Sequence, residues 1–493
     1  MDSSTVTRLF RRLANHHFCH DRTRALPRTA RQHAGSIRNL SSAPRDPTDG
    51  SSWQQRTDNF PSDKTNEYQR YPVLTADALR TRRERPRRVK MLLRDFVEDS
   101  LYNPHYGYFS KNVTIFHPGM PFEFDKIKDE PELQKILGHR YTQFEDKLDE
   151  IEQSDTRQLW HTPTELFRPF YGEAIARYMV ANYKLSLYPY HDLLIYEMGA
   201  GNGTLMLDIL DYIRNTDPEV YARTKFRIIE VSSALATLQM NKLKTDVASK
   251  GHLGKVEIVN KSIFDWDSYI STPCFFLAME VFDNFAHDVI RYDLVTKEPL
   301  QGSVLIDSQG DFYEFYSRKL DPIAARYLRL REKASQNRKY STPVRDPGFM
   351  QTLRYKLPFA PNLTVPEYIP TRLMQFFHIL HTKFPAHRLI TTDFHSLPQA
   401  TVGYNAPVVQ TRYQRRTVLV RTPLVQQGYF DIMFPTDFGV MEDMYRAITG
   451  RLSRVMTHET FFQRWAYAED TQLRSGENAL LNWYKNQSVM LTV

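Results

Sequence analysis

Apolar residues change their spacing along the chain near residue 192. Upstream, they recur every three or four positions, as on one face of a helix, over residues 90–110 and 162–183. Downstream, short apolar runs alternate with helical patterns. This alternation predicts an α/β fold with a mostly parallel, doubly wound sheet. The predicted strands span 192–199, 225–232, 255–262, 274–284 and 387–395, and the predicted helices span 204–215, 233–245 and 371–384.

Other segments differ from this alternation in composition. A densely charged stretch at 122–156 predicts a surface helix, and a polar, proline-punctuated stretch at about 315–365 predicts an insert. Added strands are expected from about residue 402, with helices after them. The resulting division is a presequence (1–40), a disordered linker (41–88), an N-terminal helical lid or substrate region (89–185), the α/β domain (186–445) and a C-terminal helical extension (446–493).

The first 40 residues differ from the rest of the chain in charge. Eight arginines against two aspartates place +6 of the formal net charge of +8 in this segment. Arginine and serine with few acids, and an amphipathic pattern at 5–16, are typical of a mitochondrial transit peptide. The stretch from Arg38 to Leu40 resembles a processing signal. We expect import into the mitochondrial matrix and cleavage near Leu40; a basic tail or nucleic-acid arm is the alternative.

The remaining composition argues against several classes of protein. The rest of the chain carries only the remaining +2 of formal charge, so a nucleic acid is not expected as a partner. No apolar run approaches the roughly 18 to 20 residues of a membrane-spanning helix. Cys19 and Cys274 are the only cysteines, so no disulfide framework and no metal site is predicted. These totals predict a globular protein and leave open whether it forms a homo-oligomer.

The stretch YEMGAGNGTLMLDI, from Tyr196 onward, places three glycines at alternate positions between a predicted strand and a predicted helix. Gly199, Gly201 and Gly203 can adopt positive φ angles and let a ligand approach the backbone. A dinucleotide fingerprint needs its third glycine at position 204, where threonine stands, and no P-loop lysine follows. The spacing points instead to S-adenosyl-L-methionine, whose ammonium Glu197 could engage.

A second acid meets the next requirement of that ligand. Glu230 ends the following predicted strand, where its carboxylate could accept both hydroxyl hydrogens of the ribose. Ser262 and Ile263 follow the third strand and are predicted to line the adenine. The alternative is a buried turn whose glycines only pack helix against strand. Because both acids fall where the ligand needs them, we predict a site for S-adenosyl-L-methionine.

Segments spread from about residue 92 to residue 440 resemble the MidA-like family of mitochondrial complex I assembly-factor methyltransferases. The segments are FVEDSLYNPHYGYFS, TPTELFRPFYGEAIA, IIEVSSALATLQMNKL, AMEVFDNFAHDVI and GYFDIMFPTDF. The resemblance implies a Rossmann-like class I methyltransferase domain that uses S-adenosyl-L-methionine. It also implies a protein substrate, namely an arginine of a complex I subunit that is dimethylated symmetrically during assembly.

Carboxylates at strand ends are the predicted catalytic residues. A carboxylate can hold a guanidinium by bidentate hydrogen bonds and leave the attacking nitrogen free. Glu280, after the fourth strand, is the first candidate and Asp283 the second; Asp393, at the end of a later strand, is a third. Acids at such positions can instead cap a neighbouring helix.

Departures from the family's motifs leave alternatives open. Ala200 and Asn202 stand in the glycine turn where the family has Pro and Arg, while Met279, Asn284 and Ala286 replace its Asn, Ala and Pro. The second group favours an alternative function, an assembly scaffold that binds S-adenosyl-L-methionine without catalysis. A methyltransferase acting on RNA or a small molecule is the third hypothesis.

Overall fold

The computed structural model describes residues 52–55, 63–111, 113–244, 251–252, 254–334, 340–345 and 362–493. The chain divides into two units, Met1–Asp49 and Gly50–Val493, and every described residue lies in the second. The predicted presequence and its cleavage site therefore lie outside the described residues. Within the described part, no helix is both long and apolar enough to cross a membrane.

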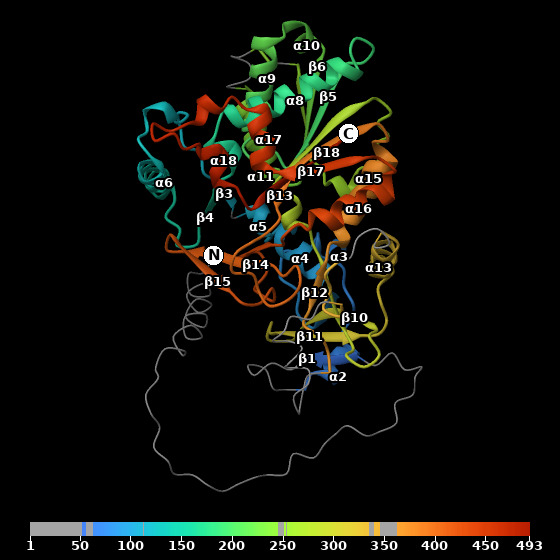
Figure 1. Ribbon diagram of the computed structural model, residues 1–493. Coiled ribbons are helices and arrows are strands. Elements are labelled where there is room, and N and C mark those ends of the chain that lie inside the picture. Colours follow the sequence, from blue (N-terminus) through green and yellow to red (C-terminus); the bar gives the residue numbers. More distant parts are fainter. Residues whose placement is uncertain are drawn as a thin grey trace. The chain divides into compact units, whose positions relative to one another are not determined.

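A seven-stranded sheet contains all five predicted strands (Figure 1). Its strand order is β17-β18-β13-β8-β5-β6-β7. The strands from β13 to β7 are parallel to their neighbours, whereas β18 is antiparallel to both β13 and β17. The strands are β5 (Leu193–Met198), β6 (Thr224–Ile229), β7 (Val256–Val259), β8 (Cys274–Met279), β13 (His387–Phe394), β17 (Ser453–Thr457) and β18 (Gln487–Thr492).

Helices cover both faces of this sheet, and β5 shows why its sequence is apolar throughout. Leu193 and Ile195 pack with α8, α9 and α17 on one face, while Leu194 and Tyr196 pack with α15 and α16 on the other. Burial on both faces removes the alternation of apolar and polar residues. The helices are α8 (Phe170–Ser186), α9 (Thr204–Thr216), α10 (Pro218–Ala222), α11 (Ser233–Lys242), α15 (Thr371–Lys383), α16 (Phe438–Thr449), α17 (His458–Trp465) and α18 (Ala479–Trp483).

The prediction of a purely helical extension over 446–493 is wrong. The helices α17 and α18 lie there, but β17 and β18 also lie there and complete the central sheet. All six residues of β18 are buried, and a short run without alternation does not identify a strand from sequence. The α/β domain therefore does not end near residue 445 but includes strands up to Thr492.

A second sheet of six strands is antiparallel throughout and was not predicted. Its order is β1-β11-β10-β9-β12, and β2 also pairs with β10. The predicted insert at about 315–365 contains α13 (Pro322–Ala334), whose buried Ala324 and Tyr327 join the hydrophobic core. The strands are β1 (Ser52–Gln55), β2 (Val89–Leu92), β9 (Asp288–Tyr292), β10 (Pro299–Ile306), β11 (Phe312–Ser317) and β12 (Glu367–Ile369).

The predicted disordered linker is wrong for residues 63–88, which hold α2 (Thr65–Arg70) and α3 (Ala76–Leu79). The ring of Tyr68 stacks on that of Phe315 in the second sheet, with 4.0 Å between centroids, and Leu79 is fully buried. Such isolated anchors order a segment whose composition is otherwise polar. Residues 52–55 of the predicted linker form β1, and its remainder lies outside the described residues.

The N-terminal region predicted at 89–185 contains strands as well as helices. The predicted helix at 162–183 is two helices, because Pro169 lacks an N–H donor and constrains the residue before it. Besides β2 and a short 3-10 helix (Phe124–Lys126), the elements of this region before α8 are α4 (Leu93–Tyr102), α5 (Tyr108–Lys111), β3 (Val113–Ile115), α6 (Glu130–Ile151), β4 (Gln158–Trp160) and α7 (Pro163–Leu166).

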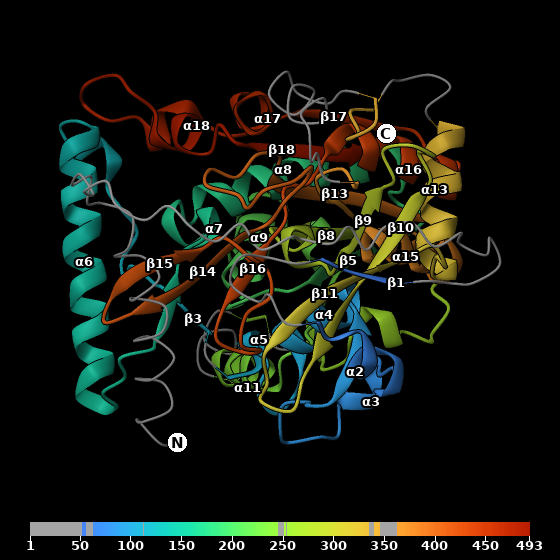
Figure 2. The same cartoon turned by 90° about the horizontal axis from the view of Figure 1, so that it is seen from below.

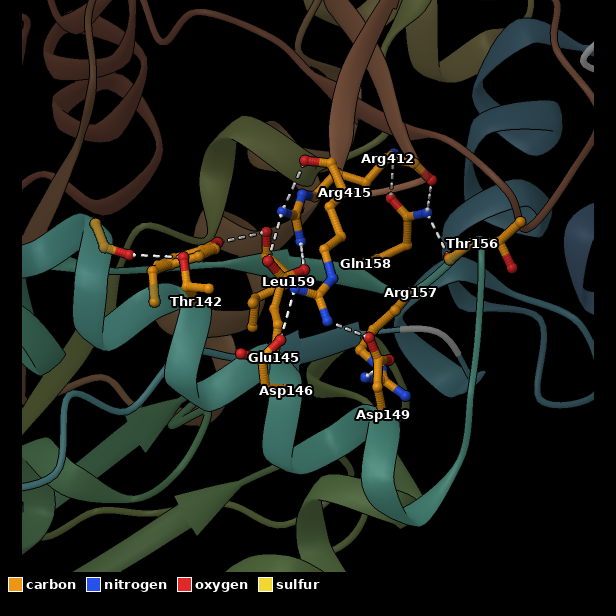
Figure 3. Close-up of polar contacts among 12 residues, drawn as sticks. Thr142, Glu145, Asp146, Asp149, Thr156, Arg157, Gln158, Leu159, Arg412 and Arg415 are labelled. Carbon is orange, nitrogen blue, oxygen red and sulfur yellow. Dashed lines mark hydrogen bonds and ion pairs between the residues drawn. The ribbon is translucent and has the colours of Figure 1, made fainter.

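The charged stretch predicted as a surface helix forms α6, which lies beside the hairpin of β14 (Val408–Tyr413) and β15 (Arg416–Val420) (Figure 2). Arg412 pairs with Glu145 at 2.6 Å, and Arg415 pairs with Asp146 at 2.8 Å (Figure 3). Gln158 of β4 accepts a hydrogen bond from the backbone of Arg412 at 2.9 Å. These contacts fix β4 between α6 and the small sheet of β14, β15 and β16 (Asp431–Met433).

Candidate functional site

The site lies where the strand order of the central sheet reverses. The strands β5 and β8 are neighbours, although the chain passes from β5 through β6 and β7 before it reaches β8. Ligands bind beyond the carboxyl ends of parallel strands at such a point. Gly199 follows β5 and Glu280 follows β8. The fold therefore brings the glycine turn and the first catalytic candidate together.

The three glycines of the turn have left-handed backbone conformations. Their φ angles are 72°, 53° and 72° for Gly199, Gly201 and Gly203. A Cβ atom on Gly201 would lie 2.7 Å from Cδ1 of Ile115, so a side chain there would strain the backbone and displace the end of the Ile115 side chain. No side chain caps α9, which starts after Gly203. The turn thus presents a close-approach surface and an uncapped helix N-terminus to a ligand.

A pocket opens beside this turn, with about 860 Å³ of space free of protein atoms, open solvent included. Six of the nine predicted site residues line it, namely Gly199, Gly201, Glu230, Ser262, Ile263 and Glu280. The other three, Glu197, Gly203 and Asp283, are not among its lining residues. Glu197 lies one residue before the lining residue Met198, and Gly203 is the last residue of the turn, directly before α9.

Glu197 carries a buried carboxylate atom that lacks a partner. The residue is 3% exposed, and within the described residues its Oε2 has no hydrogen-bond partner. Burial, and then the nearby charge of Glu230, raises the pKa of Glu197 to about 8. A buried acceptor without a donor is costly unless a ligand supplies one. The ammonium group of an S-adenosyl ligand is a donor that fits this position.

Glu230 follows β6 at the same edge of the sheet. Its Oε1 accepts from the Ser232 backbone N–H at 2.9 Å, and its Oε2 accepts from Gln239 Nε2 at 3.1 Å. These bonds orient the carboxylate, while burial raises its pKa to about 7. Each carboxylate oxygen can accept a further hydrogen bond. The residue therefore fits the ribose hydroxyls, and with Glu197 and the turn it makes a consistent site for an S-adenosyl ligand.

Ser262 and Ile263 follow β7 at the third position of this edge. The Ser262 hydroxyl accepts from the backbone N–H of Phe264 at 3.2 Å and so caps a short 3-10 helix (Ile263–Asp265). Ile263 is buried and lines the pocket. Ser262 thus shapes this wall through its turn, and Ile263 contributes the apolar surface expected beside an adenine.

Residues from α4, α5, β3 and β4 also line the pocket and form what we call its roof, within the part of the chain that the sequence predicts as a lid or substrate region. The rings of Tyr102 and Phe109 stack with centroids 5.4 Å apart, and Trp160 meets Phe109 edge-on at 6.4 Å. The Ser232 hydroxyl donates to the Phe109 carbonyl oxygen at 3.2 Å. The roof is therefore tied to the turn that carries Glu230. The sequence gives little indication that Tyr102, Phe109 and Trp160 lie together, because they come from three separate elements.

Glu165 is a second site residue whose role the sequence did not reveal. Its backbone N–H donates to Thr162 Oγ1 at 3.3 Å, so Thr162 caps α7. The Glu165 carboxylate, however, accepts from Thr204 Oγ1 at 2.7 Å and from Asn202 Nδ2 at 3.0 Å, and it pairs with His117 at 2.7 Å. These partners lower its pKa despite burial. Glu165 therefore stabilises the glycine turn through Asn202, which departs from the family's motif, and Thr204, which stands where a dinucleotide fingerprint has glycine.

Glu280 has a strained backbone at the edge of the pocket where β8 ends. Its φ of 53° is left-handed, which is unfavourable for a residue with a side chain. Its N–H donates to the Thr392 carbonyl oxygen at 2.9 Å, and its Oε1 accepts from Gln487 Nε2. Burial raises its pKa to about 8. Strain of this kind persists where the surrounding structure imposes it, and Glu280 is one of the residues that line the pocket.

Asp283 and Asp393 form a separate buried pair behind that edge. Asp393 Oδ2 accepts from the N–H groups of Phe282 and Asp283 at 2.8 and 3.2 Å, so it caps the short turn after β8. Asp283 is 4% exposed, and burial followed by the charge of Asp393 raises its pKa well above its usual range. Neither residue lines the pocket. The capping alternative thus describes Asp393, and Asp283 stays a catalytic prediction without a pocket contact.

The departures at strand four fall mostly outside the pocket. Met279 packs against the hydrophobic core, where its sulfur accepts a weak contact from Thr392 Oγ1 at 3.6 Å. Ala286 is fully buried. Asn284 does line the pocket, and its amide donates to Asp431 Oδ1 at 3.0 Å and to the Ile432 carbonyl oxygen. Only one of the three replaced positions is therefore in reach of a ligand.

Comparisons with known proteins identify the family. A family model for S-adenosyl-L-methionine-dependent methyltransferases matches residues 174–457. The chain is 25% identical over 393 residues, 76% of its length and 80% of the relative's, to the mitochondrial protein arginine methyltransferase NDUFAF7 homolog of Schizosaccharomyces pombe. It is 20% identical over 323 residues, 63% of its length and 74% of the relative's, to the protein of the same description from Saccharomyces cerevisiae.

A solved structure shares the fold. It is a superfamily member from Burkholderia thailandensis described as a methyl transferase and bound to S-adenosyl-homocysteine. The alignment has a TM-score of 0.50 and 14% sequence identity, and it covers 82% of this chain and 88% of that chain.

Proposed function

The chain belongs to the family of S-adenosyl-L-methionine-dependent methyltransferases, and we propose that it transfers the methyl group to arginine side chains of a mitochondrial protein. The observation that carries this proposal is the position of Glu280. This strained carboxylate lines the same pocket as the glycine turn and Glu230. A cofactor edge and an acid suited to bind a cation thus share one space.

The cofactor edge works through groups already in place. When bound, S-adenosyl-L-methionine supplies an electrophilic methyl group on a sulfonium. Glu197 Oε2 would hold the ammonium, Glu230 would accept the ribose hydroxyls, and Ile263 would contact the adenine. We also assign a Rossmann-like class I domain, because the order β7-β6-β5-β8-β13 is the 3-2-1-4-5 order of doubly wound nucleotide-binding sheets.

The acceptor edge has to orient a nucleophile and manage a proton. In its ionised form Glu280 would hold a guanidinium by charge-assisted hydrogen bonds and concentrate its positive charge away from the attacking nitrogen. The nitrogen loses a proton after methylation, and the same carboxylate can accept it. The elevated pKa of about 8 places that proton exchange near neutral pH.

The finer parts of the proposal rest on the relatives. Both curated relatives are described as mitochondrial protein arginine methyltransferases. Together with the arginine-rich N-terminal segment, they support a mitochondrial, specifically matrix, location. We further propose symmetric dimethylation of a complex I subunit during assembly, on the basis of the family resemblance. Asp283 would act on this substrate only indirectly.

A catalytically inactive scaffold is the second candidate, and the observation that favours it is Asn284. This replaced residue lines the pocket with its side-chain amide already bound to Asp431. Such a protein would bind the cofactor and assist assembly without methyl transfer.

The test combines binding with proteomics. Calorimetric titration of the purified protein with S-adenosyl-homocysteine should show one site. Mass spectrometry of mitochondrial proteins from cells with and without the gene should then show a symmetric dimethylarginine that disappears in its absence. Binding without any lost methylarginine would support the scaffold, and the absence of binding would refute the assigned cofactor site.

A further inference from the structure

Gln487 begins β18 and reaches the end of β8 across the strand between them. The register of β13 sets Phe394 opposite Gln487 on one side and Thr392 opposite Met279 on the other. Glu280 follows Met279, and its backbone N–H bonds to Thr392. The three strand ends therefore bring Gln487 and Glu280 into contact, although 207 residues separate them.

The contact is a hydrogen bond from an amide to a carboxylate. Gln487 Nε2 donates to Glu280 Oε1. Gln487 is fully buried, and its own Oε1 has no hydrogen-bond partner within the described residues. A buried amide oxygen without a donor is unfavourable for stability. The side chain of Gln487 is therefore held in an orientation that satisfies Glu280 but leaves its own amide oxygen without a donor.

The surroundings leave this bond as the main fixed constraint on the Glu280 side chain. Within the described residues, no Lys or Arg forms an ion pair with Glu280. Tyr171 and Tyr484 are buried, and burial followed by the charge of Glu280 raises the pKa of both phenols. The Tyr171 hydroxyl is engaged with Thr392 Oγ1 at 3.3 Å.

We propose that Gln487 is a positioning residue that holds one oxygen of the Glu280 carboxylate and directs the other toward the cationic group of the substrate. A neutral donor suits this task because a Lys or Arg at 487 would neutralise the carboxylate that must bind a guanidinium. An apolar residue would leave the carboxylate free to rotate. This inference rests on the proposed function of Glu280.

The first test is independent of the protein substrate. Sinefungin carries an amine in place of the sulfonium methyl, so its cation marks the transfer position, whereas S-adenosyl-homocysteine has no charge there. Calorimetry should show that the wild-type protein prefers sinefungin and that Gln487→Leu reduces this preference about tenfold, as expected for a hydrogen bond to a charged group. Glu280→Gln should abolish the preference.

The matched control is Gln301→Leu. Gln301 is also a buried strand residue, and its amide donates to the buried carboxylate of Asp288 at 3.0 Å, in the second sheet. Its loss should also lower the thermal unfolding temperature, because each substitution removes one amide donor from a carboxylate oxygen, although Asp288 keeps its bonds from Arg94 and Thr371. The preference for sinefungin should not change in the control.

The second test measures turnover with mitochondrial protein from cells that lack the gene. Transfer of labelled methyl groups by Gln487→Leu should fall about 10- to 100-fold in kcat. The affinity for S-adenosyl-homocysteine should stay within about threefold of wild type. A variant with normal preference for sinefungin, or a control that loses the preference equally, would overturn the inference. A wild-type protein that prefers sinefungin but methylates no arginine would instead refute the proposed substrate and leave the inference standing.

Discussion

The cofactor edge and the acceptor edge of the pocket are assembled from very different distances along the chain. The cofactor edge takes Glu197, the glycine turn, Glu230 and Ile263 from three consecutive strands and the turns that follow them. The acceptor edge joins Glu280 to Gln487 across 207 residues and places Asp393 behind both. One edge is local supersecondary structure, and the other exists only when the sheet is complete.

Because the two edges are built separately, cofactor binding and methyl transfer should respond to different substitutions. A change at the cofactor edge should alter affinity for the S-adenosyl ligand directly. A change at the acceptor edge should leave that affinity nearly intact and lower turnover. If the two edges were not independent in this way, substitutions at either would change both quantities in parallel.

The largest effect is expected from Gly201→Val. Its φ is left-handed, so a β-branched residue strains the turn, and its Cβ would lie 2.7 Å from Cδ1 of Ile115, which must move aside. We expect affinity for S-adenosyl-homocysteine, measured by calorimetry, to fall by more than about 100-fold. Gly138→Val is the control, because a Cβ there meets no atom within 4 Å. Retained affinity in Gly201→Val would contradict the placement of the cofactor.

Glu280→Gln should affect turnover nearly as strongly and affinity little. The variant keeps the shape but loses the charge that would hold the guanidinium and accept its proton. Methyl transfer to mitochondrial protein should fall about 100-fold, while the Kd for S-adenosyl-homocysteine should change by less than about threefold. A parallel loss of both would mean that Glu280 belongs to the cofactor edge.

Cofactor affinity should rise with pH. The pKa of Glu197 is raised to about 8 and that of Glu230 to about 7, so below these values both carry protons in the free protein. An ammonium requires the ionised Glu197, so binding must release a proton there. Affinity for S-adenosyl-homocysteine should increase about tenfold per pH unit below about pH 7 and level off above about pH 8. In Glu197→Gln the dependence should be flatter, and an unchanged profile would assign the proton elsewhere.

Glu165→Gln tests a smaller contribution from the brace of the glycine turn. Losing its charge weakens the bonds from Thr204 and Asn202 and the pair with His117. We expect the Kd for S-adenosyl-homocysteine to rise about three- to tenfold. Glu145→Gln is the control, since Glu145 of α6 is also a buried, paired carboxylate, but neither it nor its partner Arg412 of β14 lines the pocket (Figure 3). If both variants raised this Kd equally, Glu165 would contribute only to overall stability and not specifically to the glycine turn.

Asp283→Asn should have the smallest effect on transfer, within about threefold of wild type. Burial keeps Asp283 protonated in the folded protein, whereas the unfolded chain ionises above its ordinary pKa. The wild type therefore loses stability as pH rises above about 4, and the neutral amide removes that loss. Chemical denaturation should show the variant gaining stability over wild type between about pH 5 and pH 8. A large loss of transfer would restore Asp283 as a catalytic residue.

Local features were readable from sequence because their causes are local. The glycine spacing, the missing glycine at Thr204 and the acids at 197 and 230 identified the ligand class, and all three depend on one strand, turn and helix at a time. The corresponding walls of the pocket contain Gly199, Gly201 and Glu230. Glu280 was found in the same way, as the acid that directly follows a buried strand.

The features that the sequence did not predict depend on contacts between distant segments. The second sheet and the ordered residues 63–88 depend on pairings and ring contacts between distant segments. The role of Glu165 was not predicted, because its carboxylate reaches Asn202 and Thr204, which lie 37 and 39 residues further along the chain. Periodicity within a window carries no information about such partners.

The sequence by itself determined which ligand the turn can hold, since φ angles, glycine clearance and strand-end acids are set by neighbouring residues. Only the tertiary structure decided what faces that ligand. The pairing of β18 with β13 delivers Gln487 to Glu280, and the roof brings Tyr102, Phe109 and Trp160 over the pocket. The physical reason is that strand pairing and side-chain packing depend on the free energy of the whole fold. The local sequence of a segment does not specify which distant segment it contacts.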